Sequence, residues 1–337
     1  MKVLTTTGFY GTGSSAITDL LSEYENIECK GDFEIRIVHD PYGISDLEYN
    51  LIENPNRHNS SNALKKFNST VERICSPFFL SHYEKYFNNK FKILAKYYIN
   101  SLCEFKYKGQ WHYDLIERGN LFLFLNRLYN KIIFILKKII GIKDDVNYDF
   151  LFKNEPAYGT IVNQDVFLEN TKNFFDNLFR EINPNNKEYV MVDQLVPPSN
   201  IARYERYFSN IKVIVVDRDP RDIYLLEKKI WKGKVVPHYD VNLFCKWYEW
   251  TRKQYEITNK GNSLKIQFED LIYNYDETVK KIEKYIGLNS KYHVTPLTKF
   301  IPNISMQNTK LWEKYEDYQE EIKIIEKYLA RYCYNYK

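Results

Sequence analysis

Long apolar stretches and paired cysteines are both missing from this 337-residue sequence. No run of about 18 uncharged apolar residues occurs, so the sequence predicts no membrane-spanning helix. The five cysteines are widely spaced and form no CxxC pair, which argues against a zinc site or a disulfide framework and favours a reducing compartment. An apolar segment and a glycine-rich loop follow Met1 almost at once, leaving no room for a signal peptide. We therefore expect a cytoplasmic protein.

A strong charge of either sign is also missing. The formal net charge is +4 and the pI is about 8.5, which suits a small anionic ligand but is too mild to indicate nucleic acid as a partner. Hydrophobic residues make up 44% of the chain, enough for a sizeable core. No internal repeat and no low-complexity linker divides the sequence, so we expect a single domain.

The periodicity of apolar residues predicts an α/β fold. A short strand is expected at 3–6, a loop at 8–13 and an amphipathic helix from Ser14, and a second strand at about 33–38. Compact apolar runs at 189–192 and 211–216 are typical of strands buried on both faces, and 264–268 is a further candidate. Helices are expected at 276–286, ended by Gly287, and near the C-terminus.

Residues 45–185 differ from the rest, because their pattern is polar-aromatic and mostly helical. Neither flanking α/β part has enough strands for a sheet of its own. The prediction is one domain over 1–337, with a P-loop-like parallel sheet flanked by helices and a long, mainly helical insertion at 45–185. This insertion is expected to shape the site for the molecule on which the protein acts.

The most informative motif is a glycine-rich loop between the first strand and the first helix. Gly8 and Gly13 have the spacing of a P-loop, in which curled backbone N–H groups and a helix N-terminus face one anion. A P-loop kinase has Lys where Ser14 stands, so the side chain that grips the β- and γ-phosphates is absent. The predicted anion-binding residues are Tyr10, Gly11, Thr12, Gly13, Ser14 and Ser15.

A second anion site is predicted after the strand at 211–216. Arg218 follows the strand, and Asp219-Pro220 has the pattern of a helix start, with Asp as N-cap and Pro at the first helical position. The guanidinium is thus expected at the carboxyl end of a strand, where α/β proteins bind ligands, and can bind a phosphate through two hydrogen bonds.

These two motifs together resemble the sulfotransferases that use 3'-phosphoadenosine 5'-phosphosulfate (PAPS), of the bacterial carbohydrate type. Gly13-Ser14-Ser15 matches the family's 5'-phosphosulfate loop, and the run from Arg218 to Asp222 matches its 3'-phosphate motif. The resemblance covers about 45 N-terminal residues and about 130 from residue 188 onward. It implies PAPS as the sulfuryl donor, a hydroxyl acceptor such as a glycan, and no metal.

The sequence departs from the family at two positions. Gly11 stands where the family has Lys or Arg, and Leu226 stands where it has Ser; Tyr224 is a candidate replacement donor for that Ser. The segment 308–312 resembles the family's nucleotide-closing loop, which implies nucleotide contacts for Lys310 and Trp312. The segment 268–288 resembles a structural family segment.

The resemblance implies that Glu34, by its position after the first helix, is the catalytic base, and that Arg36, two residues on and on the same face of the expected strand, is the charge stabiliser. His39 is the rival base, because its ordinary pKa suits proton transfer. Arg36, Lys310 and Arg57 are alternative sources for the cation missing at position 11. Asp193 and Gln194 follow a buried strand and either line the acceptor pocket or cap a turn.

The insertion contains a strongly apolar segment with interspersed cations at 121–142. We favour a core or interface helix with snorkelling lysines. The alternative is a helix lying on an anionic membrane surface, at the inner face of the membrane, which would make a lipid-linked glycan acceptor attractive. The leading functional hypothesis is a glycan sulfotransferase that works by in-line displacement. The alternatives are a P-loop nucleotide kinase and a catalytically inactive nucleotide-binding protein of the same fold.

Overall fold

The structure is a computed structural model that describes residues 1–78, 83–109, 111–141, 154–233, 235–258 and 261–336. Residue 142 of the predicted helix at 121–142 lies outside these ranges. Within them, no helix is both long and apolar enough to cross a membrane.

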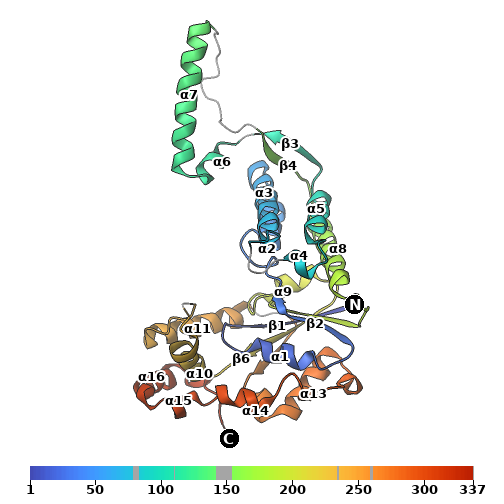
Figure 1. The fold of residues 1–337 in the computed structure, drawn as a ribbon, viewed down its shortest axis with the longest axis vertical. Coiled ribbons are helices and arrows are strands. Elements are labelled where there is room, and N and C mark those ends of the chain that lie inside the picture. The colour runs from blue at the N-terminus through green and yellow to red at the C-terminus, as the bar shows by residue number, and fades with distance from the viewer. Residues whose placement is uncertain (79–82, 110, 142–153, 234, 259–260, 337) are drawn as a thin grey trace.

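A five-stranded parallel sheet forms the centre of the α/β half, in the order β2-β5-β1-β6-β7 (Figure 1). The N-terminal strand β1 lies in the middle and pairs with two strands from the later part of the chain, as predicted for a shared sheet. The central strands are almost completely buried, which explains their continuous apolar sequences. The strands are β1 (Lys2–Gly8), β2 (Ile27–Glu34), β5 (Tyr189–Asp193), β6 (Ile211–Asp217) and β7 (Ser263–Gln267).

The second strand lies earlier in the chain than predicted. It ends at Glu34, with an irregularity between Lys30 and Glu34, and the expected strand residues 35–38 form a turn. The apolar side chains of that turn are nevertheless buried, because they pack into a core completed by the inserted helices. The sequence of this turn resembles that of a strand because distant parts of the chain bury its apolar side chains.

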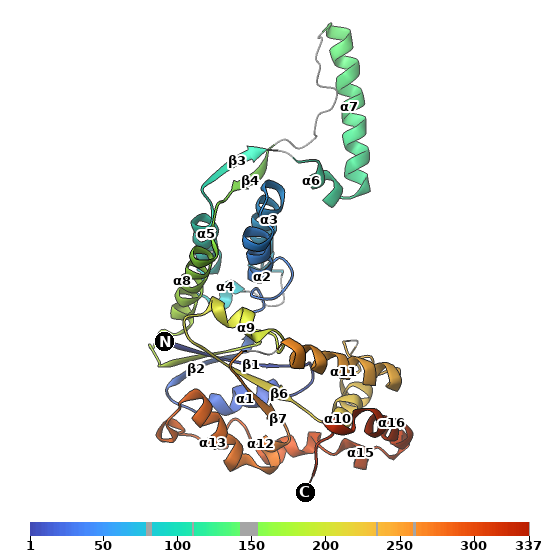
Figure 2. The ribbon, with the colours of Figure 1, turned by 180° about the vertical axis from the view of Figure 1, so that it is seen from behind.

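Helices cover both faces of the sheet. The helix α1 and the later α12 and α13 pack on one face through a common hydrophobic cluster, and Figure 2 shows them on the side of the sheet away from the insertion. A third cluster joins α10, α11, α15 and α16 beside the sheet. The helices of this half are α1 (Ser14–Leu21), α9 (Ile201–Tyr204), α10 (Pro220–Leu225), α11 (Val241–Thr258), α12 (Asp270–Tyr273), α13 (Tyr275–Ile286), α14 (Pro302–Ser305), α15 (Leu311–Lys314) and α16 (Gln319–Leu329).

The chain between β2 and β5 rises from the other face of the sheet as an extended region (Figures 1 and 2). Its helices stand next to the sheet, the antiparallel strand pair β3-β4 follows, and α7 lies at the end farthest from the sheet. The elements are α2 (Ile44–Glu48), α3 (Arg57–Ile74), α4 (Tyr83–Tyr86), α5 (Phe91–Ser101), β3 (Phe105–Gly109), α6 (His112–Glu117), α7 (Asn120–Ile140), β4 (Glu155–Gly159) and α8 (Gln164–Ile182).

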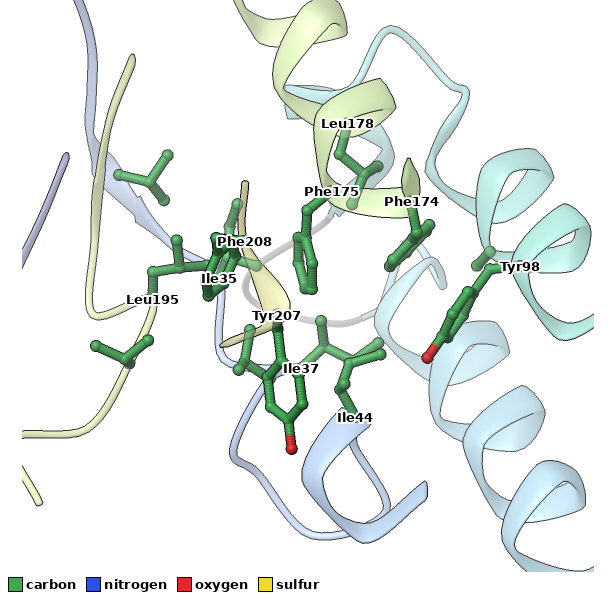
Figure 3. Close-up of a cluster of buried hydrophobic side chains, with 14 of the residues drawn as sticks. Ile35, Ile37, Ile44, Tyr98, Phe174, Phe175, Leu178, Leu195, Tyr207 and Phe208 are labelled. Carbon is green, nitrogen blue, oxygen red and sulfur yellow. The ribbon is translucent and has the colours of Figure 1, made fainter. Parts of the chain in front are cut away.

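The inserted helices and the sheet share one hydrophobic core, shown in part in Figure 3. Aromatic rings dominate it: the rings of Phe175 and Phe208 have centroids 4.7 Å apart, and those of Tyr98 and Phe174 stack at 4.9 Å. The polar tips of the tyrosines are paired: the Tyr98 hydroxyl lies 2.8 Å from the Thr171 hydroxyl, and the Tyr207 hydroxyl donates to Glu48. The base of the insertion is thus held to the sheet by close aromatic packing.

The core position favoured for the segment 121–142 is wrong for the part that the structure describes. Of the residues of α7, only Asn126 is buried, while large apolar side chains such as Ile139 are exposed. The segment does form a helix, as its periodicity predicts, but the sheet and the helices that stand on it are too far away to cover it (Figure 1).

Candidate functional site

The loop between β1 and α1 has the backbone conformation that its glycines predict. Tyr10, Gly11 and Gly13 all have positive φ, of 74°, 70° and 84°. A Cβ atom on Gly13 would lie 2.6 Å from the ring of Phe268, so this position tolerates no side chain. The loop is therefore curled tightly against the residue that follows β7.

The curled loop leaves a set of main-chain donors free. Within the described residues, the N–H groups of 11–14 have no hydrogen-bond acceptor. Gly13 is the N-cap of α1 and offers no side-chain cap, so the positive end of the helix faces the same space. Donors and helix dipole together form a site for an anion.

The side chains of the loop are placed in three ways. Ser14 Oγ accepts a hydrogen bond of 3.0 Å from Gln194 Nε2, which joins the loop to the end of β5. Thr12 is buried beneath the loop, and a Cβ atom on Gly8 would collide with its hydroxyl. Ser15 and Tyr10 are exposed. Ser15 and the main chain of the loop therefore face solvent, where a ligand can reach them.

A cavity of about 510 Å³ lies over this loop. Its walls come from the carboxyl ends of β1, β2, β5, β6 and β7, the edge at which open α/β sheets bind ligands. All six predicted loop residues line it, as do Glu34 and Arg218. The remaining lining residues are Ala16, Asp19, Asp193, Gln194, Trp231, Phe268, Phe300, Ser305 and Asn308.

Arg218 is positioned by the start of α10. The Asp219 side chain accepts from Arg221 N and Pro220 occupies the first turn, as the sequence predicts. Arg218 itself is 3% exposed. Its Nη1 donates to Gly11 O at 3.4 Å, and its guanidinium lies 4.4 Å from the centroid of the Phe268 ring.

The charge of Arg218 is not neutralised by a direct partner. Within the described ranges no carboxylate lies within 4 Å of it, and its Nε is buried without an acceptor. Burial lowers the pKa of the guanidinium, because water is excluded from the charged form. A buried cation with an unused donor, aimed at an anion-binding loop, is suited to receive an anionic ligand.

The nearby acidic residues are engaged elsewhere. Asp217 forms ion pairs with Arg252 at 2.7 Å and Lys265 at 2.9 Å, and Asp219 pairs with Arg221. Burial raises the pKa of two further carboxyls, to about 7 for Asp222 and about 8 for Glu269. Glu269 is therefore largely protonated at neutral pH and Asp222 partly so, which leaves the surroundings of Arg218 less negative than the sequence suggests.

Glu34 lies at the last position of β2, half-exposed and on the cavity wall. Arg36 lies beyond the strand, so the strand alternation used to predict its direction does not apply. Its Nη1 is nevertheless 3.7 Å from a Glu34 oxygen, while its other nitrogens bind Asp40. The predicted pair is therefore in contact, although Arg36 does not line the cavity.

His39 lies behind this pair, away from the cavity lining. Burial lowers its pKa to about 4, and its ring packs edge-on against Tyr204. A histidine with so low a pKa is neutral at physiological pH and is a weak base, which disfavours the rival assignment.

Asp193 is the register partner of Glu34 in the sheet. Burial and, to a smaller extent, the charge of Glu34 raise the pKa of Asp193 to about 6, although a hydrogen bond from the Thr6 hydroxyl opposes the shift. Asp193 and Gln194 both line the cavity, which favours the acceptor-pocket interpretation over a simple turn cap. The cavity thus has two neighbouring carboxyls on one wall.

The structure explains the unusual glycine at position 11. A Cβ atom there would lie 3.1 Å from the Trp231 ring, and its φ of 70° is one that side chains rarely adopt. Trp231 thus occupies the space that the family's loop cation would need. Apart from Arg218, none of the described residues that line the cavity is a cation.

Four other predicted residues lie away from this cavity. The Tyr224 hydroxyl accepts from Lys228, and Leu226 is buried in the same cluster beside the sheet. Lys310 Nζ lies 4.8 Å from the centroid of the Tyr336 ring. Trp312 packs on Arg221 at 3.8 Å. Arg57 is farther away, in the insertion, where it contacts His58.

The segment after α13 supplies Phe300 and Ser305, which sequence reasoning missed, and Asn308, the first residue of the predicted nucleotide-closing segment. Arg218 Nη2 donates to Asn308 O, and Phe300 is held by a buried carboxylate, Glu23. Glu23 accepts from the main chain at Leu297, Thr298, Lys299 and Phe300 at 2.8–3.2 Å. A lone Glu after an amphipathic helix gives no sequence signal of this long-range role.

No group of three or more His, Cys, Asp or Glu side chains that could hold a metal ion occurs among the described residues. No protein-family model matches the sequence, and no curated protein matches it either.

The solved structures that resemble the chain include three sulfotransferases. The sulfotransferase domain of the Synechococcus olefin synthase has a TM-score of 0.43 and 9% identity, covering 100% of this chain and 95% of that one. A Mycobacterium tuberculosis sulfotransferase has a TM-score of 0.32, 10% identity and coverages of 92% and 76%. One from Mycobacterium avium has 0.35, 10%, 92% and 68%. At TM-scores below 0.5 these likenesses carry no argument about activity, and the function has to be argued from the cavity itself.

Proposed function

We propose that this protein is a PAPS-dependent sulfotransferase that transfers a sulfuryl group to a hydroxyl, with a glycan as the acceptor. The observation that carries the proposal is the pairing of two anion sites in one cavity. A P-loop without the kinase lysine lies next to Arg218, a buried guanidinium without an ion-pair partner among the described residues. PAPS carries a phosphosulfate at its 5' position and a phosphate at its 3' position, so it has one anionic group for each site.

The residues fit the donor at both positions. The free N–H groups of 11–14 and the N-terminus of α1 would hold the 5'-phosphosulfate, and Ser14 and Ser15 would add hydroxyl donors. Arg218 would hold the 3'-phosphate through its guanidinium, whose Nε has no acceptor among the described residues. When bound, PAPS supplies an activated sulfuryl group.

The chain's own chemistry centres on Glu34. Its carboxylate takes the proton of the acceptor hydroxyl while the hydroxyl oxygen forms a bond to sulfur and the bond from sulfur to the phosphate oxygen breaks, in line. The main-chain donors of the loop stabilise the developing charge on the departing oxygen. Arg36, with a guanidinium nitrogen 3.7 Å from a Glu34 oxygen, would hold that carboxylate in place.

The glycan acceptor is inferred from the resemblance to carbohydrate sulfotransferases and from the open carboxylate-bearing wall at Glu34 and Asp193. One observation keeps a second candidate, a nucleotide-binding protein without catalysis. Leu226, in place of the usual Ser, is buried in a different cluster, and Trp231 fills the space of the usual loop cation.

Calorimetric titration tests the donor site. We expect adenosine 3',5'-bisphosphate to bind more tightly than AMP or ATP, and Arg218→Ala to weaken the bisphosphate by about 10–150-fold. Arg331→Ala, on the exposed surface, is the matched control and should bind normally. Arg218→Lys keeps the charge and guards against misfolding of the alanine variant.

Equal binding of the three nucleotides, or an unchanged affinity in both Arg218 variants with intact folds, would refute the PAPS assignment. Preference for ATP would favour the kinase alternative. Tight bisphosphate binding without sulfuryl transfer to any acceptor in a glycan screen would favour the inactive nucleotide-binding protein.

A further inference from the structure

The helix at the far end of the insertion, α7, has an exposed apolar stripe along its length. The residues of the stripe recur every three or four positions, with Ile135 and Leu136 adjacent, and so lie on one helix face. Their exposed fractions run from 38% to 74%, although residues of these types are usually buried. The stripe consists of Leu121, Leu125, Leu128, Ile132, Ile135, Leu136 and Ile139.

All the charged residues of α7 are basic. Arg127, Lys131 and Lys138 are exposed and flank the stripe, because they are four and seven positions apart on the helix. No carboxylate within the described ranges lies within 4 Å of these three cations. Within the part of the chain that the structure describes, the helix therefore combines an uncovered apolar face with a positive flank that no carboxylate neutralises.

The rest of the fold, as far as the structure describes it, does not cover this face. Figures 1 and 2 agree that α7 lies at the end of the insertion, with the strand pair β3-β4 between it and the helices that stand on the sheet. Contiguous exposed apolar surface of this kind marks an interaction site. A basic amphipathic helix is also too charged to span a bilayer, in agreement with the absence of a spanning helix in the described chain.

We propose that α7 binds flat on an anionic membrane surface, with the apolar stripe in the boundary between headgroups and acyl chains. The three exposed cations would then contact lipid headgroups. Charge decides between this occupant and a second copy of the chain. Two copies of α7 would bring cation against cation with no acidic residue on either helix to pair with them. The proposal does not depend on the sulfotransferase assignment.

Co-sedimentation of the full chain with vesicles tests the proposal. We expect binding to vesicles of phosphatidylcholine with phosphatidylglycerol and little binding to phosphatidylcholine alone. Each cation near an anionic surface contributes about fivefold to binding, so the triple variant Arg127→Gln, Lys131→Gln, Lys138→Gln should bind about a hundredfold more weakly. The control with the same net charge is Lys253→Gln, Lys327→Gln, Arg331→Gln, in the α/β half, which should bind normally.

A second variant tests the apolar stripe. Leu128→Ser with Ile132→Ser should weaken vesicle binding at least about tenfold and leave the thermal unfolding of the rest of the protein unchanged. Equal loss in the control triple variant, equal binding to neutral and anionic vesicles, or no loss in either α7 variant overturns the proposal. Self-association in sedimentation velocity that both α7 variants abolish would also overturn it, since a second copy would then cover the stripe.

Discussion

The α/β half and the insertion bury different kinds of side chain. In the α/β half, the fully buried ionisable groups include Glu23, Asp217, Arg218, Arg252 and Glu269. Among the described residues between 44 and 182, Glu48 is the only buried acidic or basic side chain, and it pairs with Arg203 and Arg206 from outside the insertion. Aromatic rings make up much of the rest of that interior.

The two regions therefore differ in the free-energy cost of the side chains that they bury. Burying charge is costly unless the charge is paired, so a region that keeps several buried ions does so for a reason other than packing. Of these groups, Arg218 lines the cavity, Asp217 and Arg252 form an ion pair, and Glu23 accepts from the main chain at Phe300. The base of the insertion buries few charged side chains, and its far end exposes apolar side chains.

The largest expected effect is on catalysis in the α/β half. Glu34→Gln should lower sulfuryl transfer by about 10²–10⁴-fold, because the neutral amide cannot take a proton. Affinity for adenosine 3',5'-bisphosphate should not change. Release of the bisphosphate from PAPS with a glycan acceptor measures the first and calorimetry the second.

The control for Glu34 is Glu188→Gln, a carboxylate that is 48% exposed, like that of Glu34, but lies at the opposite end of the sheet. Its transfer rate should equal that of the unmodified chain. Undiminished transfer in Glu34→Gln would move the base to another group, with Asp193 first in line.

The next effect concerns the loop. Gly13→Ala should abolish measurable bisphosphate binding, because its Cβ would collide with Phe268. Gly287→Ala is a matched control: its φ is the same 84°, but no atom lies within 4 Å of the added Cβ. It should cost about 1 kcal/mol of stability and leave binding intact. Similar binding by both variants would contradict the proposed cradle.

Within the insertion, two phenylalanines should behave oppositely. Phe175→Ala, fully buried beside the sheet, should lower the free energy of unfolding by about 3–5 kcal/mol. Phe134→Ala on α7, 62% exposed, should change it by less than about 0.5 kcal/mol. Urea unfolding measures both. A comparable loss at Phe134 would mean that α7 is packed against the protein after all.

The smallest effect concerns pH. Burial raises the pKa of Glu269 to about 8, so the folded protein keeps a proton that the unfolded chain loses above about pH 4.5. Stability from this group is full below that pH and is lost as the pH rises to about 8. In Glu269→Gln, which keeps the acceptor for Asp219 N, the fall in Tm between about pH 5 and pH 8 should be a few degrees smaller. Parallel Tm curves for the two proteins would show that Glu269 is already ionised.

Local patterns predicted much of the α/β half. The spacing of Gly8 and Gly13 placed the loop between β1 and α1, and Asp219-Pro220 placed the start of α10. These signals are readable because the conformation is set by the residues themselves. Asp193 was expected near a ligand site because it follows a buried strand, and Glu34 because of the resemblance; both line the cavity.

The errors arose where distant parts of the chain decide the outcome. The turn after Glu34 has the sequence of a strand because inserted helices bury it. Tyr224, the candidate replacement for the family's Ser, lies in α10 but packs in the cluster beside the sheet and does not line the cavity. For α7, periodicity gives the helix and its faces, but not which other part of the fold packs against them.

The strand order also has a consequence for the order of folding. The first strand has no neighbour until β5 and β6 exist, and Lys2 meets Tyr189 across 187 residues. At about 5–20 residues synthesised per second, β1 waits roughly 10–40 s for a partner. During that interval its apolar face depends on α1 alone for cover, so nascent chains truncated before β5 are where we expect this protein to need a chaperone.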